Sequence, residues 1–442
     1  MLLEFKTKNY KSFKDGFVFS MQSTPKQKGL DYSILKQKIG STTHKALCSS
    51  VVYGPNASGK TNIIGAMDAF KSIVLRGNIR NAINCDSPNP AANILELIPN
   101  CKIVDNEPIG FTILFIDNGI LIEYSFDADI GRFLQSDYNR KIVYEELKIN
   151  GKQVFERNNE LVIDNLTSIN HFLNKSLSEN EQSAVSLAKN NLNDDELFLN
   201  NGFKTIFSTK LTSLINGWLE RRLIIIFRAD SMLPSIMIHN PKEKLVYTMP
   251  FLYEAVKIFG ISSNAIGYIK EDNEVEPKLV SFIKTDGNEE GTVILADKFE
   301  SYGTVRFAYL LPHINEVIRN GGTIVIDEFD ASIHPMALMS ITNVFHNDEI
   351  NVHKAQLIFN THNPIFLNSN LFRRDEIKFT DRDDKTGYSE HYSLSDFGTR
   401  GENGVRKEDD YQKDYFISRY GAIKDIDFSP IFDAVADESK EV

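Results

Sequence analysis

One short segment, residues 54–61, constrains the fold of this chain more than any other. It reads Gly-Pro-Asn-Ala-Ser-Gly-Lys-Thr, which fits the phosphate-binding loop pattern G-x-x-x-x-G-K-[ST]. The apolar run over residues 49–53 predicts a buried strand, and apolar residues at helical spacing predict a helix over residues 62–75. A strand, a glycine loop and a helix in this order are the context that the pattern requires. The sequence therefore predicts an α/β fold of the P-loop class.

Each part of this loop has a separate task in binding a nucleoside triphosphate. Gly54 and Gly59 let the backbone curl so that its N–H groups face the phosphates, and the helix adds its positive end. Lys60 is expected to reach the β- and γ-phosphates, and Thr61 to offer its hydroxyl to Mg²⁺. The expected ligands are thus ATP and Mg²⁺. The predicted nucleotide-binding residues are Gly54, Pro55, Asn56, Ala57, Ser58, Gly59, Lys60, Thr61 and Asn62.

Two later strands are expected to deliver the residues that hydrolyse the nucleotide. The apolar residues 323–326 are followed by Asp327 and Glu328. Asp327 is predicted to hold Mg²⁺ through water, and Glu328 to be the base that polarises the attacking water. A strand over residues 356–360 leads to His362, which can reach the γ-phosphate if its strand ends at the same edge of the sheet. Glu328 and His362 are the predicted catalytic residues, although a histidine here could also simply bond loop carbonyls.

A third candidate site lies before a predicted helix whose apolar stripe covers residues 307–317. Ser301, Gly303 and Thr304 form a Ser-x-Gly-Thr segment at the start of this helix. A serine and a glycine at a helix N-terminus can cradle an anion. The motif alone is a weak signal, and it gains meaning only beside the phosphate-binding loop.

The rest of the chain predicts antiparallel strands followed by an inserted helical segment. Strands are expected at 2–10 and 17–21, and hairpins at 109–126 and 142–156 around Asn-Gly turns, whereas residues 23–45 and 78–99 are expected to be loops. Helices are expected at 204–222 and 251–259, with a strand at 223–227. This gives an N-terminal lobe with an antiparallel β subdomain at residues 1–165. An inserted helical or lid subdomain follows at residues 166–285, and a C-terminal lobe at residues 286–442.

Composition limits the partners and the cellular compartment. The formal charge of −11 argues against a mainly electrostatic nucleic-acid binder. The first 45 residues carry nine lysines and three acids, which indicates either a contact patch or a solvated strand face. Three cysteines without metal-type spacing predict reduced thiols and a cytoplasmic protein. No apolar run approaches about 18 residues, so no membrane span is expected.

Taken together, the motifs resemble the ABC-type ATPase heads, which include SMC, RecF and DNA-repair ATPases. They are most similar to the stand-alone bacterial AAA/ABC ATPases of abortive phage-defence systems, of the RloA/AbiL and PARIS kind. The resemblance rests on the segments NYKSF, GPNASGKTN, ESYGT, IDEFDASIHP, THNP, RRDEIKF, YSLSDF and RYGAI. It spans both ends of the chain and is weakest between residues 166 and 275.

The resemblance implies a homo-oligomer of head-to-tail dimers that enclose two ATP molecules. Ser301 and Gly303, with Thr304, would contact the γ-phosphate held by the other head, and Asp330 would couple the two sites. One feature departs from the pattern, because residues 75–106 contain no convincing glutamine loop. Asn93, Asn100 or nothing equivalent would then replace that Mg²⁺- and water-contacting glutamine.

Several functions fit such a head. The first is a sensor or scaffold in anti-phage defence that responds to a phage protein and controls a separate effector nuclease, Toprim-like or other, from the same operon. The second is a DNA-repair or DNA-clamping ATPase of the RecF/SMC type, against which the acidic charge and compact insertion count. A fused nuclease of the OLD type would need a Toprim-like domain with paired acids after His362. Only about eighty residues remain there, and the acidic residues 381–385 resemble a hydrated turn rather than a metal site. A generic P-loop enzyme such as a kinase fits the Ser-x-Gly and Thr-His segments poorly.

Overall fold

The fold is taken from a computed structural model of the chain. It describes residues 1–25, 27, 29–80, 96–135, 138–174, 181–190, 192–227, 246–247, 254–255, 257, 264–269, 277–285, 288–400, 404–424 and 427–430. Most of the loop expected at 78–99, the acidic residues 271–276, most of the helix expected at 251–259, and Asn93 therefore lie outside the described residues. Within the described part, no helix is both long and apolar enough to span a bilayer.

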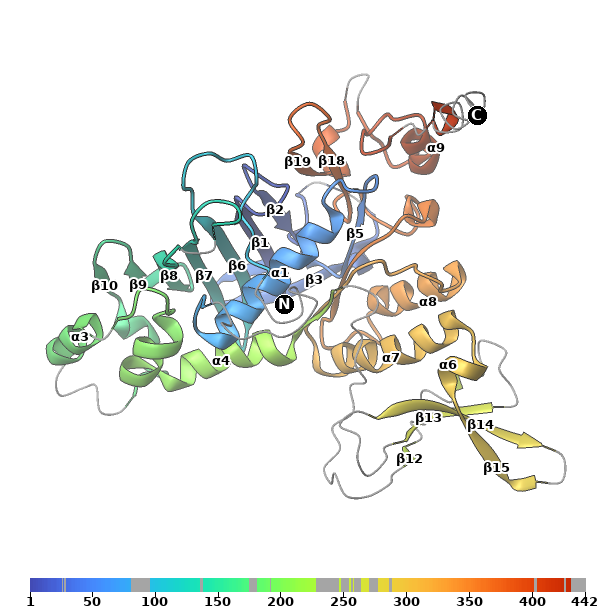
Figure 1. The fold of residues 1–442 in the computed structure, drawn as a ribbon, viewed down its shortest axis with the longest axis horizontal. Helices are drawn as coiled ribbons and strands as arrows, with labels where there is room; N and C mark the ends of the chain where they lie inside the picture. The colour runs from blue at the N-terminus through green and yellow to red at the C-terminus, as the bar shows by residue number, and fades with distance from the viewer. Residues whose placement is uncertain are drawn as a thin grey trace, which may run out of the picture.

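A six-stranded sheet forms the centre of the molecule (Figure 1). Five of its strands are parallel, and the sixth pairs antiparallel at the edge. The order is β11 (Leu223–Ile226), β16 (Thr323–Ile326), β17 (Gln356–Asn360), β5 (Ser49–Tyr53), β18 (Ile377–Arg382) and β19 (Ser389–Ser393). β5, β16 and β17 are buried at every residue, which explains why they read as continuous apolar runs.

Helices cover both faces of this sheet. Val52 and Ile358 pack in the same cluster as α1 (Lys60–Arg76). Their neighbours Val51 and Leu357 pack with α7 (Tyr302–Asn320) and α8 (Pro335–His346). Because successive side chains of a strand point to opposite faces, α1 lies on one side of the sheet and the two later helices on the other. This confirms the predicted α/β fold of the P-loop class.

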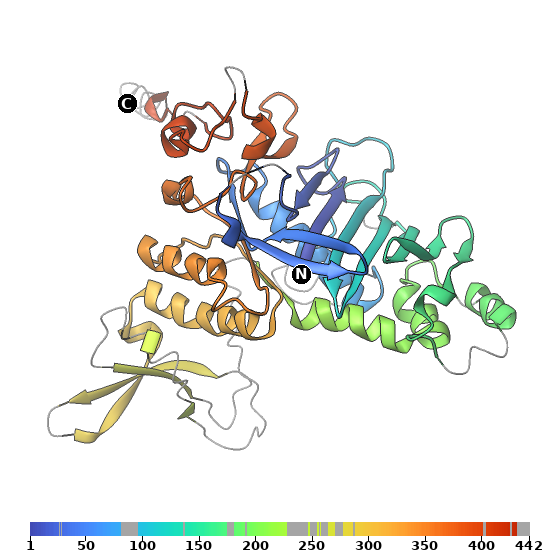
Figure 2. The same ribbon diagram turned by 180° about the vertical axis from the view of Figure 1, so that it is seen from behind.

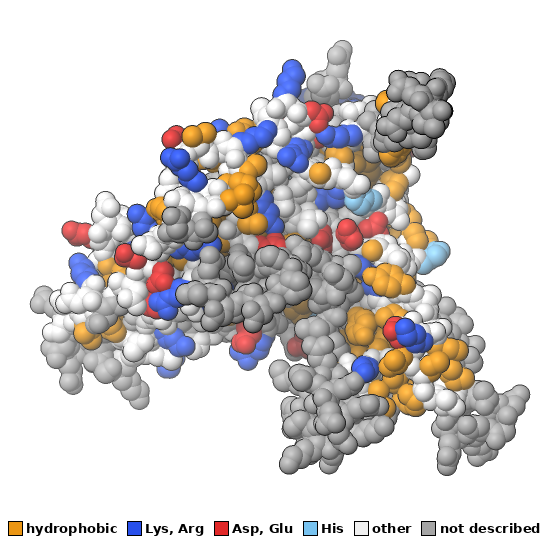
Figure 3. All heavy atoms as spheres, in the orientation of Figure 1, with side chains coloured by type: hydrophobic (Ala, Val, Ile, Leu, Met, Phe, Trp, Pro, Cys, Tyr) orange, Lys and Arg blue, Asp and Glu red, His pale blue; other side chains and the backbone are white. Residues whose placement is uncertain are grey.

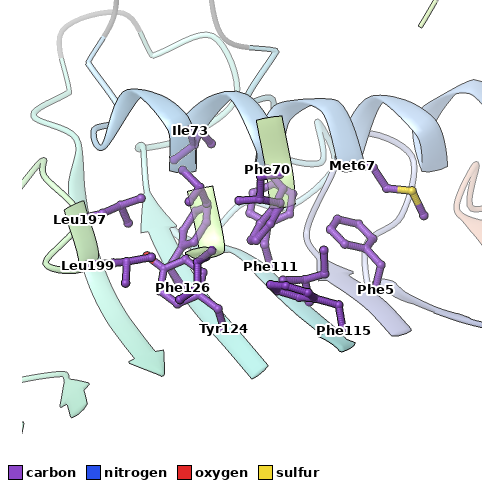
Figure 4. Packing of buried hydrophobic residues seen from close by; sticks show 14 of the residues in the cluster. Phe5, Met67, Phe70, Ile73, Phe111, Phe115, Tyr124, Phe126, Leu197 and Leu199 are labelled. Atoms are coloured by element: carbon purple, nitrogen blue, oxygen red, sulfur yellow. The ribbon is translucent and has the colours of Figure 1, made fainter. Parts of the chain in front are cut away.

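A second, antiparallel sheet lies on the other side of α1. Its order is β10 (Leu161–Ile163), β9 (Lys152–Arg157), β8 (Lys141–Ile149), β7 (Ile120–Asp129), β6 (Ile109–Asp117), β1 (Leu2–Lys8) and β2 (Phe17–Ser20). Figure 4 shows Phe70 of α1 against Phe111 and Phe126 of this sheet, and the Phe70 and Phe126 rings are stacked with centroids 5.6 Å apart. The N-terminal strands and both predicted hairpins are confirmed.

Residues 23–45 are not the loop that their polar composition suggested. They include η1 (Asp31–Ser33), and β3 (Ile34–Ile39) pairs with β4 (Thr42–Leu47) as a long hairpin, seen in front in Figure 2. The inner positions Leu35 and Ala46 are buried, whereas the lysines between them are exposed. Long lysine side chains are compatible with the exposed face of a strand. The many lysines therefore obscured the alternation of buried and exposed residues that is typical of a strand.

The inserted segment is helical only in its first part. It contains η2 (Leu166–Ile169), α3 (Glu181–Asn190), a π-helical segment (Leu199–Phe207) and α4 (Thr209–Arg221). β11 then joins the central sheet, which differs from its expected place in a separate insertion. A four-stranded antiparallel sheet follows, made of β12 (Val246–Tyr247), β13 (Asn264–Ile269), β14 (Lys278–Thr285) and β15 (Asn288–Leu295). The β14–β15 hairpin crosses the boundary expected at residue 285.

The C-terminal part completes the central sheet. α6 (Ala296–Phe299) precedes α7, and η6 (Pro364–Phe366) follows β17. η7 (Leu394–Phe397) and α9 (Tyr411–Phe416) cover the β18–β19 edge, where the Phe379 and Tyr415 rings are stacked with centroids 5.9 Å apart. Helix α9 therefore packs against β18, the strand that neighbours β5.

Candidate functional site

The phosphate-binding loop joins the buried end of β5 to the start of α1, as predicted. Gly59 has φ +115°, a conformation that only glycine adopts readily. A Cβ at Gly54 would lie 2.3 Å from the carbonyl oxygen of Thr380, so the strand β18 leaves no room for a side chain there. Ser58 Oγ and Thr380 Oγ1 share a hydrogen bond of 2.7 Å, which fixes the loop against the same strand. The loop is thus held in a curled form.

Lys60 points back into this loop. Its ammonium donates hydrogen bonds to the carbonyl oxygens of Gly54 at 2.7 Å and Pro55 at 3.0 Å. Burial lowers the pKa of Lys60 from 10.5 to about 8, against the attraction of Asp327 and two neighbouring acids. Lys60 is 93% buried, and no carboxylate of the described residues is in direct contact with its ammonium. Such a lysine has a strong electrostatic preference for an anionic ligand.

The predicted Mg²⁺ ligands lie beside each other. Thr61 Oγ1 donates to Asp327 Oδ1 at 3.2 Å, and Asn360 Nδ2 donates to the same carboxylate oxygen. Thr61 follows β5 and Asp327 follows β16, with β17 between these two strands. A hydroxyl and a carboxylate that converge in this way are the oxygen donors that Mg²⁺ takes at nucleotide sites. The residues present therefore fit the cation.

Glu328 occupies an unusual backbone position. Its φ is +50°, which is uncommon for a non-glycine residue and typical of functional turns. Its N–H donates to Asn360 Oδ1 at 2.6 Å, and its carbonyl oxygen accepts from Arg306 Nη2 at 2.5 Å. These two bonds hold the turn from both sides, so that the Glu328 side chain lines the pocket.

His362 lies on the same edge, after β17. Its backbone N–H donates to Asp330 Oδ2 at 3.3 Å, which connects it to the acidic turn after β16. Burial, together with the nearby positive charge of Lys60, lowers the pKa of His362 below its ordinary 6.5. The imidazole is therefore neutral near pH 7 in the nucleotide-free protein.

These groups surround one pocket of about 430 Å³ at the C-terminal ends of the parallel strands. Acidic side chains in the middle of the molecule lie beside lysine, arginine and histidine side chains in Figure 3. The pocket is lined by Ser12, Asn56, Ala57, Ser58, Gly59, Lys60, Thr61, Asn62, Glu328, Asn360, His362 and Arg382. The structure thus brings the loop, Glu328 and His362 together as the sequence predicted.

The Ser-x-Gly segment lies apart from this pocket in the same chain. Ser301 caps α7, and its Oγ accepts from the N–H of Thr304 at 3.2 Å. A Cβ at Gly303 would lie 2.0 Å from the carbonyl oxygen of Ser332, so the first turn of α7 packs directly on the loop that contains Asp330. None of these four predicted residues lines the pocket described above, so their role across a dimer interface stays a prediction.

Three further residues belong to the site and were not singled out from the sequence. Asn360 bridges Asp327 and Glu328, and Arg306 holds their carbonyls while its Nε and Nη1 lack hydrogen-bond partners among the described residues. Arg382 lines the pocket and reaches the phosphate-binding loop at the carbonyl of Ala57, 3.5 Å away. Two sequence features could have indicated these residues. Arg306 is a charged residue inside the apolar stripe of α7, and Asn360 is a polar residue at the end of a buried strand.

Asn100 does not act as the missing glutamine in this structure. It is buried, its side-chain amide donates to the carbonyl of Lys11 at 2.7 Å, and its oxygen accepts from the N–H of Lys102. Asn100 is absent from the pocket lining, so its described role is to hold the loop after β1. A larger hollow of about 950 Å³ lies between β2 and β19, but it has no glycine loop that could receive phosphates.

Comparisons with known proteins give one family match and two similar solved structures. No curated protein sequence matches the chain. Among solved structures, the SMC head domain from Thermotoga maritima aligns with a TM-score of 0.35 and 13% identity, over 89% of this chain and 98% of that one. The Smc head domain with coiled coil and joint from Pyrococcus yayanosii aligns with a TM-score of 0.35 and 12% identity, over 89% of this chain and 96% of that one. Residues 49–368 match the family described as "AAA domain, putative AbiEii toxin, Type IV TA system".

That match covers the phosphate-binding loop, the acidic turn, the Ser-x-Gly segment and the Thr-His segment. It confirms the predicted relationship to the AAA ATPases of abortive-infection systems. The chain belongs to this family of AAA domains.

Proposed function

We propose that this protein hydrolyses ATP to ADP and phosphate. The observation that carries the proposal is the convergence of Lys60, Thr61, Glu328 and His362 on one pocket. Asp327 is hydrogen-bonded to Thr61 beside it. A phosphate-binding loop alone would support binding only. The added carboxylate and imidazole at the far side of the pocket supply what hydrolysis needs, namely a base for water and a contact for the γ-phosphate.

Each residue has a distinct task in this proposal. The N–H groups of the loop and the Lys60 ammonium bind the phosphates, and the ammonium leaves the carbonyls of Gly54 and Pro55 to do so. Thr61 and Asp327 hold Mg²⁺, which neutralises charge on the phosphate oxygens when bound. Glu328 orients and polarises the attacking water, in a turn fixed by Asn360.

We further propose that two copies meet head to tail across the nucleotides. Ser301, Gly303 and Asp330 would then complete the partner's site. Two observations support this arrangement: the segment caps a helix at the surface, and exposed apolar side chains gather over the neighbouring region (Figure 3). Those side chains are Val293, Leu295, Phe299 and Tyr302, exposed by 44%, 38%, 45% and 61%.

For the cellular role, we propose a sensor or scaffold in anti-phage defence that controls a separate effector nuclease from the same operon. The family description, which names a toxin–antitoxin system, supports this direction. Among the described residues, the sole cluster of three metal-ligating side chains is Cys48, His346 and Glu376, which is buried and lacks the paired acids of a Toprim-like nuclease. The described helices do not exceed 19 residues, so the long arms of a DNA-clamping ATPase are not among them.

The test is co-purification with the product of the neighbouring gene, with ATP and Glu328→Gln, weighed by native mass spectrometry. The proposal expects a stable assembly that contains a nuclease subunit and an even number of ATPase chains. A lone dimer that binds duplex DNA only with ATP would instead favour the DNA-clamping alternative. A monomer with ATP bound would contradict the head-to-tail arrangement.

A further inference from the structure

Three buried side chains with different metal-binding groups meet at the edge of the central sheet opposite the nucleotide pocket. Cys48 precedes β5, His346 ends α8, and Glu376 precedes β18. One potential ligand atom from each lies within 4.8 Å of the other two, and all three residues are buried. Sequence spacing could not indicate the cluster, because Cys48 is about 300 residues from the other two members along the chain.

The distance between the imidazole and the carboxylate of the cluster fits a bound cation. His346 Nε2 and Glu376 Oε1 are 3.3 Å apart. With metal–nitrogen and metal–oxygen bonds of about 2.0–2.1 Å, two ligands of a tetrahedral Zn²⁺ site are separated by about 3.3–3.4 Å. Ser49 Oγ is hydrogen-bonded to each of these two atoms at 2.8 Å, which is closer than two ligands of one tetrahedral site, so a water would fill the remaining position.

The surroundings of the cluster have the features of a second shell. Glu376 Oε2 accepts the backbone N–H of Arg373 at 2.8 Å, which fixes the carboxylate so that Oε1 faces His346. The rings of Tyr32 and Phe372 pack on His346 with centroids 5.6 Å away. Tyr32 is itself 39% exposed, so on this side one side chain separates His346 from the surface.

The electrostatics also favour a cation. Within 4 Å of the Glu376 carboxylate, the described residues supply one group able to carry positive charge, the imidazole of His346.

We propose that Cys48, His346 and Glu376 form a structural site for a divalent transition metal, with Zn²⁺ the ion that suits a thiolate, an imidazole and a carboxylate. Binding deprotonates the Cys48 thiol and releases that proton to solvent. The ion would join the starts of β5 and β18 to the end of α8. Two of these elements adjoin segments of the candidate site. β5 continues into the phosphate-binding loop, and α8 begins after the turn that contains Asp330.

The experiment uses the full chain with the substitutions Cys85→Ser and Cys101→Ser, which leave Cys48 as the only thiol. The protein is incubated with Zn²⁺ or Co²⁺ and desalted, and its metal content is measured by plasma mass spectrometry. We expect about one ion per chain, and with Co²⁺ a thiolate-to-metal charge-transfer band with tetrahedral visible bands. Because one thiol remains, that band can arise only from Cys48.

Further substitution of Cys48→Ala or His346→Gln in this background is expected to reduce the metal content at least about tenfold. Removal of the ion is expected to lower the melting temperature by at least about 3 °C. A background protein that retains less than about 0.1 ion per chain and shows no charge-transfer band would overturn the proposal. That result would mean that the Ser49 hydroxyl alone joins His346 and Glu376. Because it is measured on the background protein, this outcome does not depend on whether the Cys48 and His346 variants fold.

Discussion

The charge of Lys60 makes nucleotide binding depend on pH in a defined direction. In the nucleotide-free protein, burial lowers the pKa of this ammonium to about 8. A triphosphate in contact with the ammonium stabilises its charged form and raises the pKa again. The protein therefore takes up a proton when ATP binds above pH 8, and its apparent affinity falls as pH rises through that value.

The size of the effect follows from the two protonation states. With a pKa of about 8, about nine-tenths of the free protein carries the charge at pH 7 and about one-tenth at pH 9. The dissociation constant for ATP is then about tenfold higher at pH 9 than at pH 7, which corresponds to about 1.4 kcal/mol. His362 does not add to this slope, because its lowered pKa leaves it neutral throughout.

Calorimetric titration of ATP at pH 7, 8 and 9, in buffers of different ionisation enthalpy, measures both the affinity and the proton uptake. About three-quarters of a proton per ATP is expected at pH 8.5. The matched control is Lys60→Arg, whose guanidinium keeps its charge over this range, so its weaker binding should not change with pH. A wild-type affinity that is flat from pH 7 to 9, or an equal slope in Lys60→Arg, would refute the reasoning.

The same shift predicts how stability depends on pH. Because the folded pKa of Lys60 is lower than its unfolded value, the unfolded chain binds more protons between about pH 8 and 10.5. This residue therefore opposes folding below pH 8, and that penalty is relieved as pH rises towards 10.5. Lys60→Met should consequently raise the free energy of unfolding at pH 7 while it abolishes ATP binding, as measured by urea denaturation and titration. A variant less stable than wild type would contradict the electrostatic account.

Three other substitutions test the packing around the site and the core. Gly303→Ala places a methyl group 2.0 Å from the Ser332 carbonyl oxygen, which forces the start of α7 away from the loop with Asp330. We expect ATP binding to persist while turnover falls at least about tenfold. Unchanged steady-state turnover would contradict this. Asn360→Ala removes both of its contacts to the acidic turn and should lower the Mg²⁺-dependent rate by about 10–100-fold, and a rate within twofold of wild type would be evidence against it. Trp218→Ala removes a buried ring that stacks on Phe115 at 4.0 Å and should cost about 3–5 kcal/mol in urea denaturation followed by circular dichroism, whereas a loss below about 1 kcal/mol would show that the ring does little.

The sequence predicted the functional centre well because its parts are local. The loop at residues 54–61, the acidic pair after β16 and the histidine after β17 each adjoin a fully buried strand. In a parallel sheet the C-terminal ends of the strands meet at one edge, so strand assignment alone places these residues together. For that reason the sequence predicted the fold class and which residues line the candidate site.

The remaining parts of the fold depend on contacts distant in sequence. β11 pairs with β16 a hundred residues later, and nothing in its short apolar run distinguishes a sheet strand from part of an insertion. Asn360 and Arg306 become functional only when the turn after β16 lies between them. The Cys48 cluster likewise needs three distant segments. Local pattern cannot specify such pairings, which tertiary packing decides.

The measurement that tests the central claim most directly is the ATP turnover of Glu328→Gln beside wild type, with nucleotide affinity measured on the same preparations. The amide keeps the size and hydrogen-bonding reach of the side chain but cannot accept a proton from water. The account predicts that ATP binding is retained and that turnover falls at least about 100-fold. Unchanged turnover in Glu328→Gln would remove this residue from its role and contradict the proposed hydrolytic site.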